Sequence, residues 1–299
     1  MPTATVSLFI NPAAGRGRAA RRLVRITELL EQSRIAVDVR QSRAVGDLEE
    51  QTYMAVCDGI DKIIVAGGDG SIHEAVNGIM RADGSAALGI VPTGTGNDFA
   101  KACSIPLDWQ HATQLLAERI AKNTAMRRID IGCMNDRYFA NGAGIGFDAK
   151  VTRIARSYQW PVGDIVYLLA VFRCMIDGIA TPDMRIVADH QCWSGPVTLA
   201  NVSNGPWIGG MFHIAPMADN TDAKLELLIA DPVSRLRLLT LLPKLMRGEH
   251  FDEQEVNHAS VTKVTVDARA PVPSHLDGEV QPLQTRFEIE VLPGALNLL

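Results

Sequence analysis

The chain has 299 residues, 47% of them hydrophobic, and this length exceeds the roughly 100–200 residues typical of one domain, which favours two domains with sizeable cores. Its 29 basic and 34 acidic residues give a net charge of -5, so no overall positive field exists to hold nucleic acid or an anionic membrane, although a local basic face is still possible. The five cysteines are scattered without the C-x-x-C spacing of disulfide or zinc frameworks, which predicts a reducing, cytoplasmic location.

The first part of the chain alternates short apolar strands with helical patterns. A β-branched run over residues 5–10 leads into a Gly-rich loop and then a helical pattern over 18–32. The same order repeats three times. The expected strand and helix pairs are 35–40 with 47–57, 62–66 with 71–80, and 87–91 with 108–121. This alternation predicts βαβ units, right-handed crossovers and a parallel sheet.

After about Arg127 the pattern changes to short strands separated by turn residues, which is typical of an antiparallel domain. The expected strands are 128–133, 138–141, 184–189, 196–203, 225–230 and 261–267, and the expected helices are 164–179 and 233–247. The first of these helices is interrupted by charges, so we expect a buried or partly amphipathic helix rather than a membrane span. The change predicts domains over 1–128 and 129–299, with the last segment free to return to the first domain.

Three of the four strand ends in the first part are Gly-rich loops, over residues 11–17, 67–73 and 92–98. In a parallel sheet, ligands bind at the carboxyl ends of the strands, where backbone N–H groups and helix N-termini attract anions. The sequence therefore predicts an anion-binding edge, although an ordinary tight turn is the alternative for each loop taken alone.

The loop over 67–73 is the most specific of the three. Its glycines let the backbone approach a phosphate closely, Asp69 can face a cation, and Ser71 can cap the following helix. In the loop over 92–98, Thr95 offers a hydroxyl and Asp98 offers a turn or metal contact. These residue types together favour a bound nucleotide.

The first loop also fits a second interpretation. Gly15-x-Gly17-x-x-Ala20 follows a strand, and Asp38 lies about 20 residues on, as in a dinucleotide-binding fingerprint. An NAD(P)-binding oxidoreductase is therefore an alternative. Arginines crowded between residues 16 and 25 instead favour several phosphates held at one edge. A Walker loop is excluded, because the chain contains no Gly-Lys-Ser/Thr.

Taken together, the loops resemble the diacylglycerol kinase catalytic family. Its hallmarks appear in the family's order as Asn11 to Gly17, Gly67 to Ser71, Gly94 to Asp98 and Asp277-Gly278-Glu279. The resemblance implies an α/β nucleotide-binding domain of NAD kinase type followed by a β-sandwich substrate domain. It also implies a lipid kinase that moves the γ-phosphoryl group of ATP to a lipid hydroxyl, with a non-catalytic lipid or nucleotide sensor as a further alternative.

The resemblance assigns roles to individual residues. It places the nucleotide at Asn11, Ser42, Gly67, Gly68, Asp69, Gly70, Ser71, Ile72, His73 and Thr95. It gives Mg²⁺ to Asp69, Asp98 and Asp130, and it makes Glu279 the proton acceptor with Asp277 as the competing assignment. The family commonly has Asn where His73 stands, and we expect His73 to be a solvent-facing helix residue that only shapes the loop.

A second acidic cluster resembles the family's structural metal loop. Asp222 would supply a carboxylate, while Asp219 and Lys224 would supply main-chain oxygens. Ala223 stands where the family commonly has glycine, so a plain polar turn is an alternative.

A lipid acceptor implies an apolar cleft and transient contact with a membrane surface. Residues 204–213 could line such a cleft, with buried sandwich core as the alternative. The sequence does not choose among diacylglycerol, phosphatidylglycerol and a sphingoid base, and it leaves open whether the chain forms a homodimer.

Overall fold

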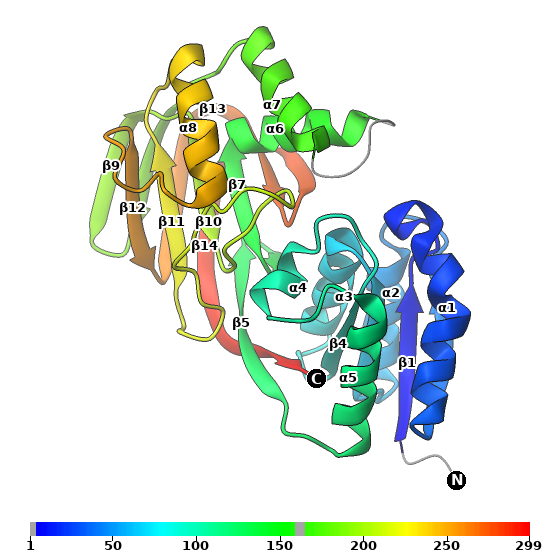
Figure 1. The fold of residues 1–299 in the computed structure, drawn as a ribbon. Coiled ribbons are helices and arrows are strands. Elements are labelled where there is room, and N and C mark those ends of the chain that lie inside the picture. Colours follow the sequence, from blue (N-terminus) through cyan, green and yellow to red (C-terminus); the bar gives the residue numbers. More distant parts are fainter. Residues whose placement is uncertain (1–3, 159–164) are drawn as a thin grey trace. The chain divides into compact units, whose positions relative to one another are not determined.

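The computed structural model describes residues 4–158 and 165–299 (Figure 1). The chain divides into two units. The first unit comprises Met1–Asp130 together with Gly294–Leu299, and the second comprises Ile131–Pro293.

The first unit is built on a parallel sheet, as predicted. Its strands lie in the order β4-β3-β1-β2, and the end of strand β14 pairs in parallel with β4 at Asn297 and Leu298. Their bounds are β1 Ala4–Ile10, β2 Ile35–Gln41, β3 Lys62–Gly67, β4 Ala87–Pro92 and β14 Glu279–Leu298. Their buried faces consist mainly of Val, Ile, Leu and Ala, which suits strands covered on both sides.

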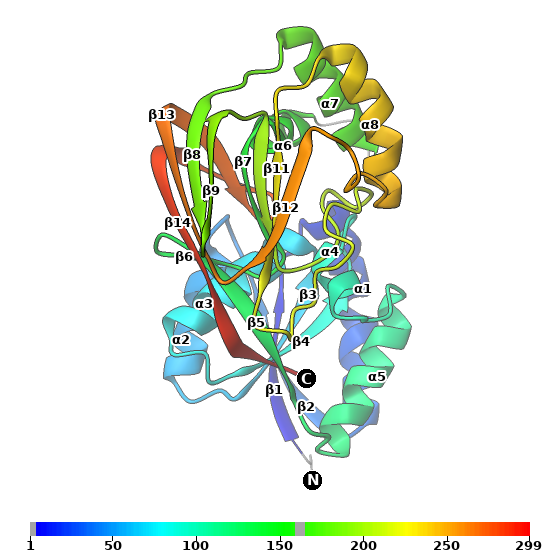
Figure 2. The same cartoon turned by 90° about the vertical axis from the view of Figure 1, so that its left-hand side faces the viewer.

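Helices cover both faces of this sheet. Helices α1 and α5 pack on one face through a shared apolar cluster, and α2 and α3 lie on the other (Figures 1 and 2). The bounds are α1 Ala14–Gln32, α2 Asp47–Cys57, α3 Asp69–Arg81, α4 Asp98–Ala102 and α5 Trp109–Ala121. Helices α1 and α3 begin earlier than expected, inside the Gly-rich segments, and the five-residue α4 is too short to show a helical period in the sequence.

The second unit is mostly antiparallel, as predicted. A run of neighbouring strands follows the order β12-β11-β10-β7-β13-β14, and β8 with β9 joins it through β13. The bounds are β5 Arg127–Met134, β6 Arg137–Phe139, β7 Gly142–Gly146, β8 Asp183–Ala188, β9 Gln191–Pro196, β10 Leu199–Ser203, β11 Leu225–Ala230, β12 Val256–Val261 and β13 Lys263–Leu276. The expected strands 196–203 and 261–267 span breaks, since β9 ends at Pro196 and β12 ends at Val261.

Three helices of the second unit share one apolar cluster. They are α6 Phe147–Ser157, α7 Ile165–Asp177 and α8 Arg235–Arg247. Helix α6 was not expected from the sequence. Helix α7 falls within the expected range 164–179, of which Asp164 lies outside the described residues. No helix in residues 4–158 or 165–299 is long and apolar enough to cross a membrane.

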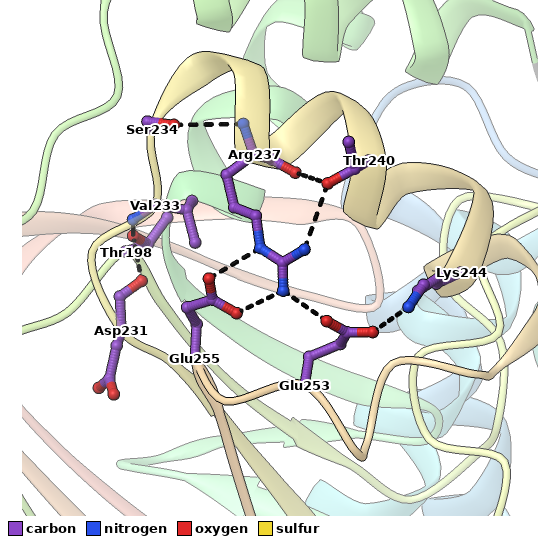
Figure 3. A network of polar contacts seen from close by, with 9 residues as sticks. All are labelled: Thr198, Asp231, Val233, Ser234, Arg237, Thr240, Lys244, Glu253 and Glu255. Carbon is purple, nitrogen blue, oxygen red and sulfur yellow. Dashed lines mark hydrogen bonds and ion pairs between the residues drawn. The ribbon is translucent and has the colours of Figure 1, made fainter.

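Helix α8 is fastened by ion pairs, which we call the α8 clamp (Figure 3). Arg237 makes a bidentate pair with Glu255 at 2.7 and 2.8 Å and also binds Glu253, which in turn binds Lys244. The hydrogen bonds from Arg237 lower the pKa of Glu255 to about 2, and those from Lys244 and Arg237 lower the pKa of Glu253. The clamp joins α8 to the segment that leads into β12.

Candidate functional site

The three Gly-rich segments of the first unit touch one another through their backbones. A Cβ on Gly94 would lie 2.4 Å from the Cα of Gly68, and a Cβ on Gly15 would lie 2.2 Å from the carbonyl oxygen of Thr93. Real Cβ atoms do not approach this closely, so only glycine fits at both positions. The segments therefore form one backbone surface at the carboxyl ends of β1, β3 and β4.

Arg18 places a cation at this edge. Its guanidinium donates to the carbonyl oxygens of Gly15 at 2.9 Å and Gly94 at 3.0 Å, and to the hydroxyl of Thr95 at 3.3 Å. Thr95 is one of the predicted nucleotide contacts. The sequence showed a crowd of arginines, but it could not single out Arg18, because the contacts that select it lie 76 and 77 residues away.

The segment from Gly67 to His73 opens helix α3. Gly68 is the N-cap residue and no side chain caps the helix, so the prediction that Ser71 would be the cap is wrong. Ser71 is instead buried in the first turn, where its Cβ would be 2.4 Å from a Cβ on Gly67. The helix thus starts at Asp69 with backbone N–H groups at its positive end, the arrangement that binds phosphate.

His73 is only 2% exposed, so the expectation of a solvent-facing residue is also wrong. Helix α3 packs against α2 and against strand β3 of the sheet, and it buries almost every residue of its middle turns. The ring of His73 lies 3.4 Å from the amide nitrogen of Asn77. Ile72 is buried as well, and both can meet a nucleotide only through the backbone.

Asn11 and Ser42 lie at the same edge of the sheet. The side chain of Asn11 accepts a hydrogen bond from the Ala13 N–H at 3.0 Å where the chain leaves β1, and the Ser42 N–H donates to the Ile10 carbonyl at 2.9 Å where it leaves β2. Both predicted residues therefore follow the carboxyl ends of parallel strands, as the loops do.

The three aspartates expected to serve Mg²⁺ each have a protein partner. Asp69 accepts from the Phe99 N–H at 3.2 Å and so caps α4, Asp98 pairs with Lys101 at 3.0 Å, and Asp130 accepts from the Gly294 N–H at 2.6 Å. Among the described residues, no group of three or more His, Cys, Asp or Glu side chains could hold a metal ion. Mg²⁺ commonly keeps several waters and takes one or two carboxylates plus phosphate oxygens, so these aspartates suit it without such a group.

In the second unit, Asp277 and Gly278 form a two-residue hairpin between β13 and β14. Leu276 pairs with Glu279, and both turn residues have positive φ, as an Asp-Gly type I′ turn requires. The Asp277 carboxylate accepts from three successive backbone N–H groups, of Ala140 at 2.9 Å, Asn141 at 2.8 Å and Gly142 at 3.0 Å. This side chain fixes the turn to the segment before β7.

Glu279 has a different partner. Its carboxylate makes a bidentate pair with Arg156 of α6, one bond of which is 2.8 Å, and Arg156 also donates to the Gly278 carbonyl at 3.3 Å. The two carboxylates of the motif therefore have separate roles in the turn. Arg156 was missed from the sequence because its helix was missed.

An apolar cavity lies in the second unit, beside this hairpin. It has a volume of about 110 Å³ and opens to solvent, and it is lined from α6, α7, α8, β10 and β11 by apolar side chains that include Val151, Val171, Leu199, Leu238 and Leu242. From the predicted stretch 204–213, Ile208, Gly209 and Phe212 line it, whereas Trp207 stacks on His213 at 4.1 Å.

Tyr167 and Asp148 connect the cavity with the hairpin. Both line the cavity. The Tyr167 hydroxyl lies 3.7 Å from the place of a Cβ on Gly278, and Asp148 lies 3.6 Å from the ring of His275. The apolar space therefore meets the Asp277-Gly278-Glu279 segment at its polar end.

The predicted structural metal loop forms two tight turns. Asp219 accepts from the backbone N–H and the hydroxyl of Thr221, at 3.0 and 2.6 Å, and Asp222 accepts from the Lys224 N–H at 3.0 Å. Ala223 has a φ of 62°, so it keeps the left-handed backbone that glycine adopts more easily.

Comparison with known proteins supports both units. Residues 5–132 match the diacylglycerol kinase catalytic domain, and residues 142–299 match the YegS C-terminal NAD kinase beta sandwich-like domain. The chain is 30% identical to a diacylglycerol kinase of Mycobacterium tuberculosis, covering 98% of this chain and 94% of that protein. It is 33% identical to a probable lipid kinase YegS-like of Serratia proteamaculans, and the match covers 99% of this chain and 94% of that protein. A crystal structure of a diacylglycerol kinase from Bacillus anthracis has the same fold, with a TM-score of 0.74 and 21% identity over 98% of this chain and 96% of that chain.

Proposed function

The chain belongs to the diacylglycerol kinase catalytic family and is a lipid kinase that uses ATP, and we propose how its residues divide the work. The first unit binds the nucleotide and the second binds the acceptor. The observation that carries this proposal is the set of glycine contacts joining three phosphate-type loops at one sheet edge. The oxidoreductase alternative loses its support, because the matching family and the named relatives are kinases.

The nucleotide phosphates bind at the carboxyl edge of the parallel sheet in this proposal. Backbone N–H groups from Gly67 to His73 face the phosphates, with further contacts from Thr95, Asn11 and Ser42. Arg18, already held by Gly94 and Thr95, adds positive charge at the same place. Charge reversal in Arg18→Glu is therefore expected to raise the KM for ATP without changing the acceptor preference.

We propose Mg²⁺ as the metal of the reaction, which when bound neutralises charge on the phosphates. Asp69, Asp98 and Asp130 would hold it, directly or through water. A structural Mg²⁺ would use the Asp222 carboxylate with the main-chain oxygens of Asp219 and Lys224. Thermal unfolding with and without Mg²⁺ tests the second site, and a stabilisation of undiminished size in Asp222→Asn would contradict it.

Glu279 is our proposed proton acceptor. Its carboxylate takes the proton from the lipid hydroxyl as that oxygen bonds to the γ-phosphorus and the bond to the ADP oxygen breaks. The side chain is 24% exposed and can be reached by an acceptor. The Asp277 carboxylate is instead committed to three backbone donors, which suits a residue that holds the turn.

The acyl chain of the acceptor occupies the apolar cavity in this proposal. A cavity with apolar walls and polar groups at one end suits a lipid tail. Leu238→Trp narrows the cavity and is expected to lower kcat/KM for long-chain diacylglycerol more than for a short-chain analogue. Leu115→Trp, on the exposed side of α5, is the matched control. An equal loss for both chain lengths would contradict the assignment.

We further propose that the enzyme is cytoplasmic and docks transiently on a membrane through α7 and α8. Each helix buries one face in a common cluster and exposes an apolar stripe, Ile165, Leu169, Phe172 and Ile176 on α7 and Leu236, Leu239 and Met246 on α8. The most exposed are Leu236 at 78% and Ile176 at 71%. Basic residues outnumber acidic ones on α6 and α8, while α7 carries one of each, and this balance favours anionic lipid. All five cysteines are free thiols, as a reducing compartment allows.

Co-sedimentation with vesicles containing phosphatidylglycerol tests the docking face. The double change Ile176→Gln and Leu236→Gln is expected to weaken binding about tenfold, because two apolar side chains no longer leave water. Val24→Gln, an exposed residue of α1, is the control. If the double variant instead dissociates a homodimer in light scattering, the stripes are a protein interface.

The acceptor itself is settled by one assay. Purified protein, labelled ATP and a total lipid extract are incubated, and the labelled product is identified by mass. Diacylglycerol is the acceptor we expect, since two relatives that are 29% and 30% identical to this chain are named diacylglycerol kinases. If the label were found on phosphatidylglycerol or on a sphingoid base, that lipid would be the acceptor in place of diacylglycerol.

A further inference from the structure

A buried polar cluster lies directly behind the Asp277-Gly278 turn. Asn201 of β10, Gly144 of β7 and His275 of β13 are partners in register across three adjacent strands. A Cβ on Gly144 would lie 2.0 Å from a carboxylate oxygen of Asp148 and 2.4 Å from Nε2 of His275. The glycine therefore makes the space in which the Asp148 carboxylate sits between Asn201 and His275.

His275 joins this cluster to the turn. The ring is 1% exposed, and its Nδ1 accepts a hydrogen bond from the Gly278 N–H at 3.3 Å. A neutral imidazole that accepts at Nδ1 carries its proton on Nε2. Nε2 faces the Asp148 carboxylate at 3.6 Å, and the same carboxylate oxygen accepts from Asn201 at 3.4 Å. The distance from Nε2 to Asp148 exceeds that of a hydrogen bond, but the negative charge of the carboxylate favours a proton on Nε2 and leaves Nδ1 to accept from the turn.

Both backbone polar groups of Gly278 are held by side chains. His275 accepts from the N–H of Gly278, and Arg156 donates to its carbonyl at 3.3 Å. This residue immediately precedes Glu279, so its orientation decides where the Glu279 side chain leaves the backbone. A displacement of about 1 Å in a reacting group is enough to cost on the order of 10²-fold in rate.

We propose that His275 is a positioning residue for phosphoryl transfer, with its ring oriented by Asp148 so that it fixes the Gly278 amide and thereby aims Glu279. The proposal rests on the role given above to Glu279. His275 does not touch the substrate, and it acts through the turn alone.

Two substitutions separate this role from simple packing. His275→Asn keeps an acceptor near the place of Nδ1, whereas His275→Phe fills the space of the ring without any acceptor. We expect His275→Phe to lower kcat about 10–100-fold with the KM for ATP changed less than about twofold, and His275→Asn to retain most of the turnover. His258→Phe, at an exposed histidine of β12, is the control.

A packing role predicts the opposite order of the two variants. Asn leaves a void in a buried position and Phe does not, so stability alone would make His275→Asn the more damaged protein. Activity that follows the melting temperatures of the two variants, or full turnover in His275→Phe, would overturn the proposal.

A readout that needs no activity completes the test. ¹⁵N spectra of the imidazole in the folded wild-type chain should show His275 neutral with its proton on Nε2, and the Gly278 amide should exchange faster in His275→Phe than in His275→Asn. A proton on Nδ1 would contradict the proposal. Full activity of Glu279→Gln would instead refute the role of Glu279, whereas an inactive Glu279→Gln beside a fully active His275→Phe would refute only the role of His275.

Discussion

The Gly-rich segments of the first unit and the Asp277-Gly278 hairpin of the second are fixed by opposite means. The segments meet backbone to backbone, and what they need is the absence of side chains at Gly15, Gly68 and Gly94. The hairpin depends on side chains, since Asp277 and His275 both bind backbone N–H groups. A backbone surface that requires small residues can be recognised in a sequence from its glycines. A turn that is held by hydrogen bonds from distant residues cannot.

The sharpest test of this comparison separates chemistry from scaffold inside the hairpin. Glu279→Gln is expected to lower kcat about 10²–10⁴-fold with ATP affinity and melting temperature nearly unchanged, because only proton transfer is lost. Asp277→Asn is expected to lower turnover too, but together with about 1–3 kcal/mol of stability, because its amide group faces backbone donors. Steady-state kinetics and chemical denaturation measure both.

The opposite result for Asp277→Asn would contradict the separate roles given to Asp277 and Glu279. If Asp277→Asn keeps full stability and loses only kcat, Asp277 is the proton acceptor and the turn is not held by its carboxylate.

The next largest effect is expected in the glycine surface. Gly94→Ala places a Cβ 2.4 Å from the Gly68 Cα, while Gly68→Ala places one 2.9 Å from the Gly94 Cα. Gly94→Ala should therefore cost about 1–3 kcal/mol of stability and raise the KM for ATP, with Gly68→Ala less affected. Titration calorimetry with a non-hydrolysable ATP analogue measures the binding. Equal, near-normal affinity in both variants would show that the contact does not shape the nucleotide site.

A smaller effect is expected at Ala223, where a residue with a side chain occupies a backbone conformation that glycine adopts more easily. Ala223 holds a φ of 62°, a conformation that costs a side-chain-bearing residue about 1–2 kcal/mol. Ala223→Gly should recover part of this and stabilise the protein by roughly 1 kcal/mol in denaturant unfolding. Ala218→Gly, in the same loop without a positive φ, should destabilise instead. Stabilisation by both would point to an effect on the unfolded chain.

The smallest effect concerns acid. Burial lowers the pKa of His250 and of His213, both in the second unit, below the ordinary value of 6.5. The unfolded chain therefore binds protons first as the pH falls through about 6.5, and the free energy of unfolding should decrease. Denaturation at pH 7.5 and 5.5 measures the slope, which should become shallower in His250→Gln and stay unchanged in His190→Gln, at an exposed position. If the free energy of unfolding depended more steeply on pH in His250→Gln than in the wild type, this explanation would be wrong.

The sequence predictions were accurate where the signal is local and failed where a feature depends on contacts between distant residues. Helix 47–57 and strand 225–230 were predicted with both ends correct, because an acidic first turn and a mainly apolar run are local signals. Strand β7 was missed since its sequence, Gly-Ala-Gly-Ile-Gly, shows no side-chain alternation, and α6 was lost with it. The loops that carry the candidate site were found from their glycines. Arg156 and His275 could not be assigned from sequence, because the first depends on a contact 123 residues away and the second on the fold of three strands.

The α8 clamp bears on how this enzyme can diversify. Arg237 and Lys244 attach the helix through Glu253 and Glu255, which lie outside the cavity wall, while Leu238, Leu241 and Leu242 face the cavity. Attachment and lining therefore use different residues of one helix. Evolution, or a protein engineer, can resize the lining for another acyl chain while the ion pairs keep the wall in place, and the nucleotide loops need not change at all.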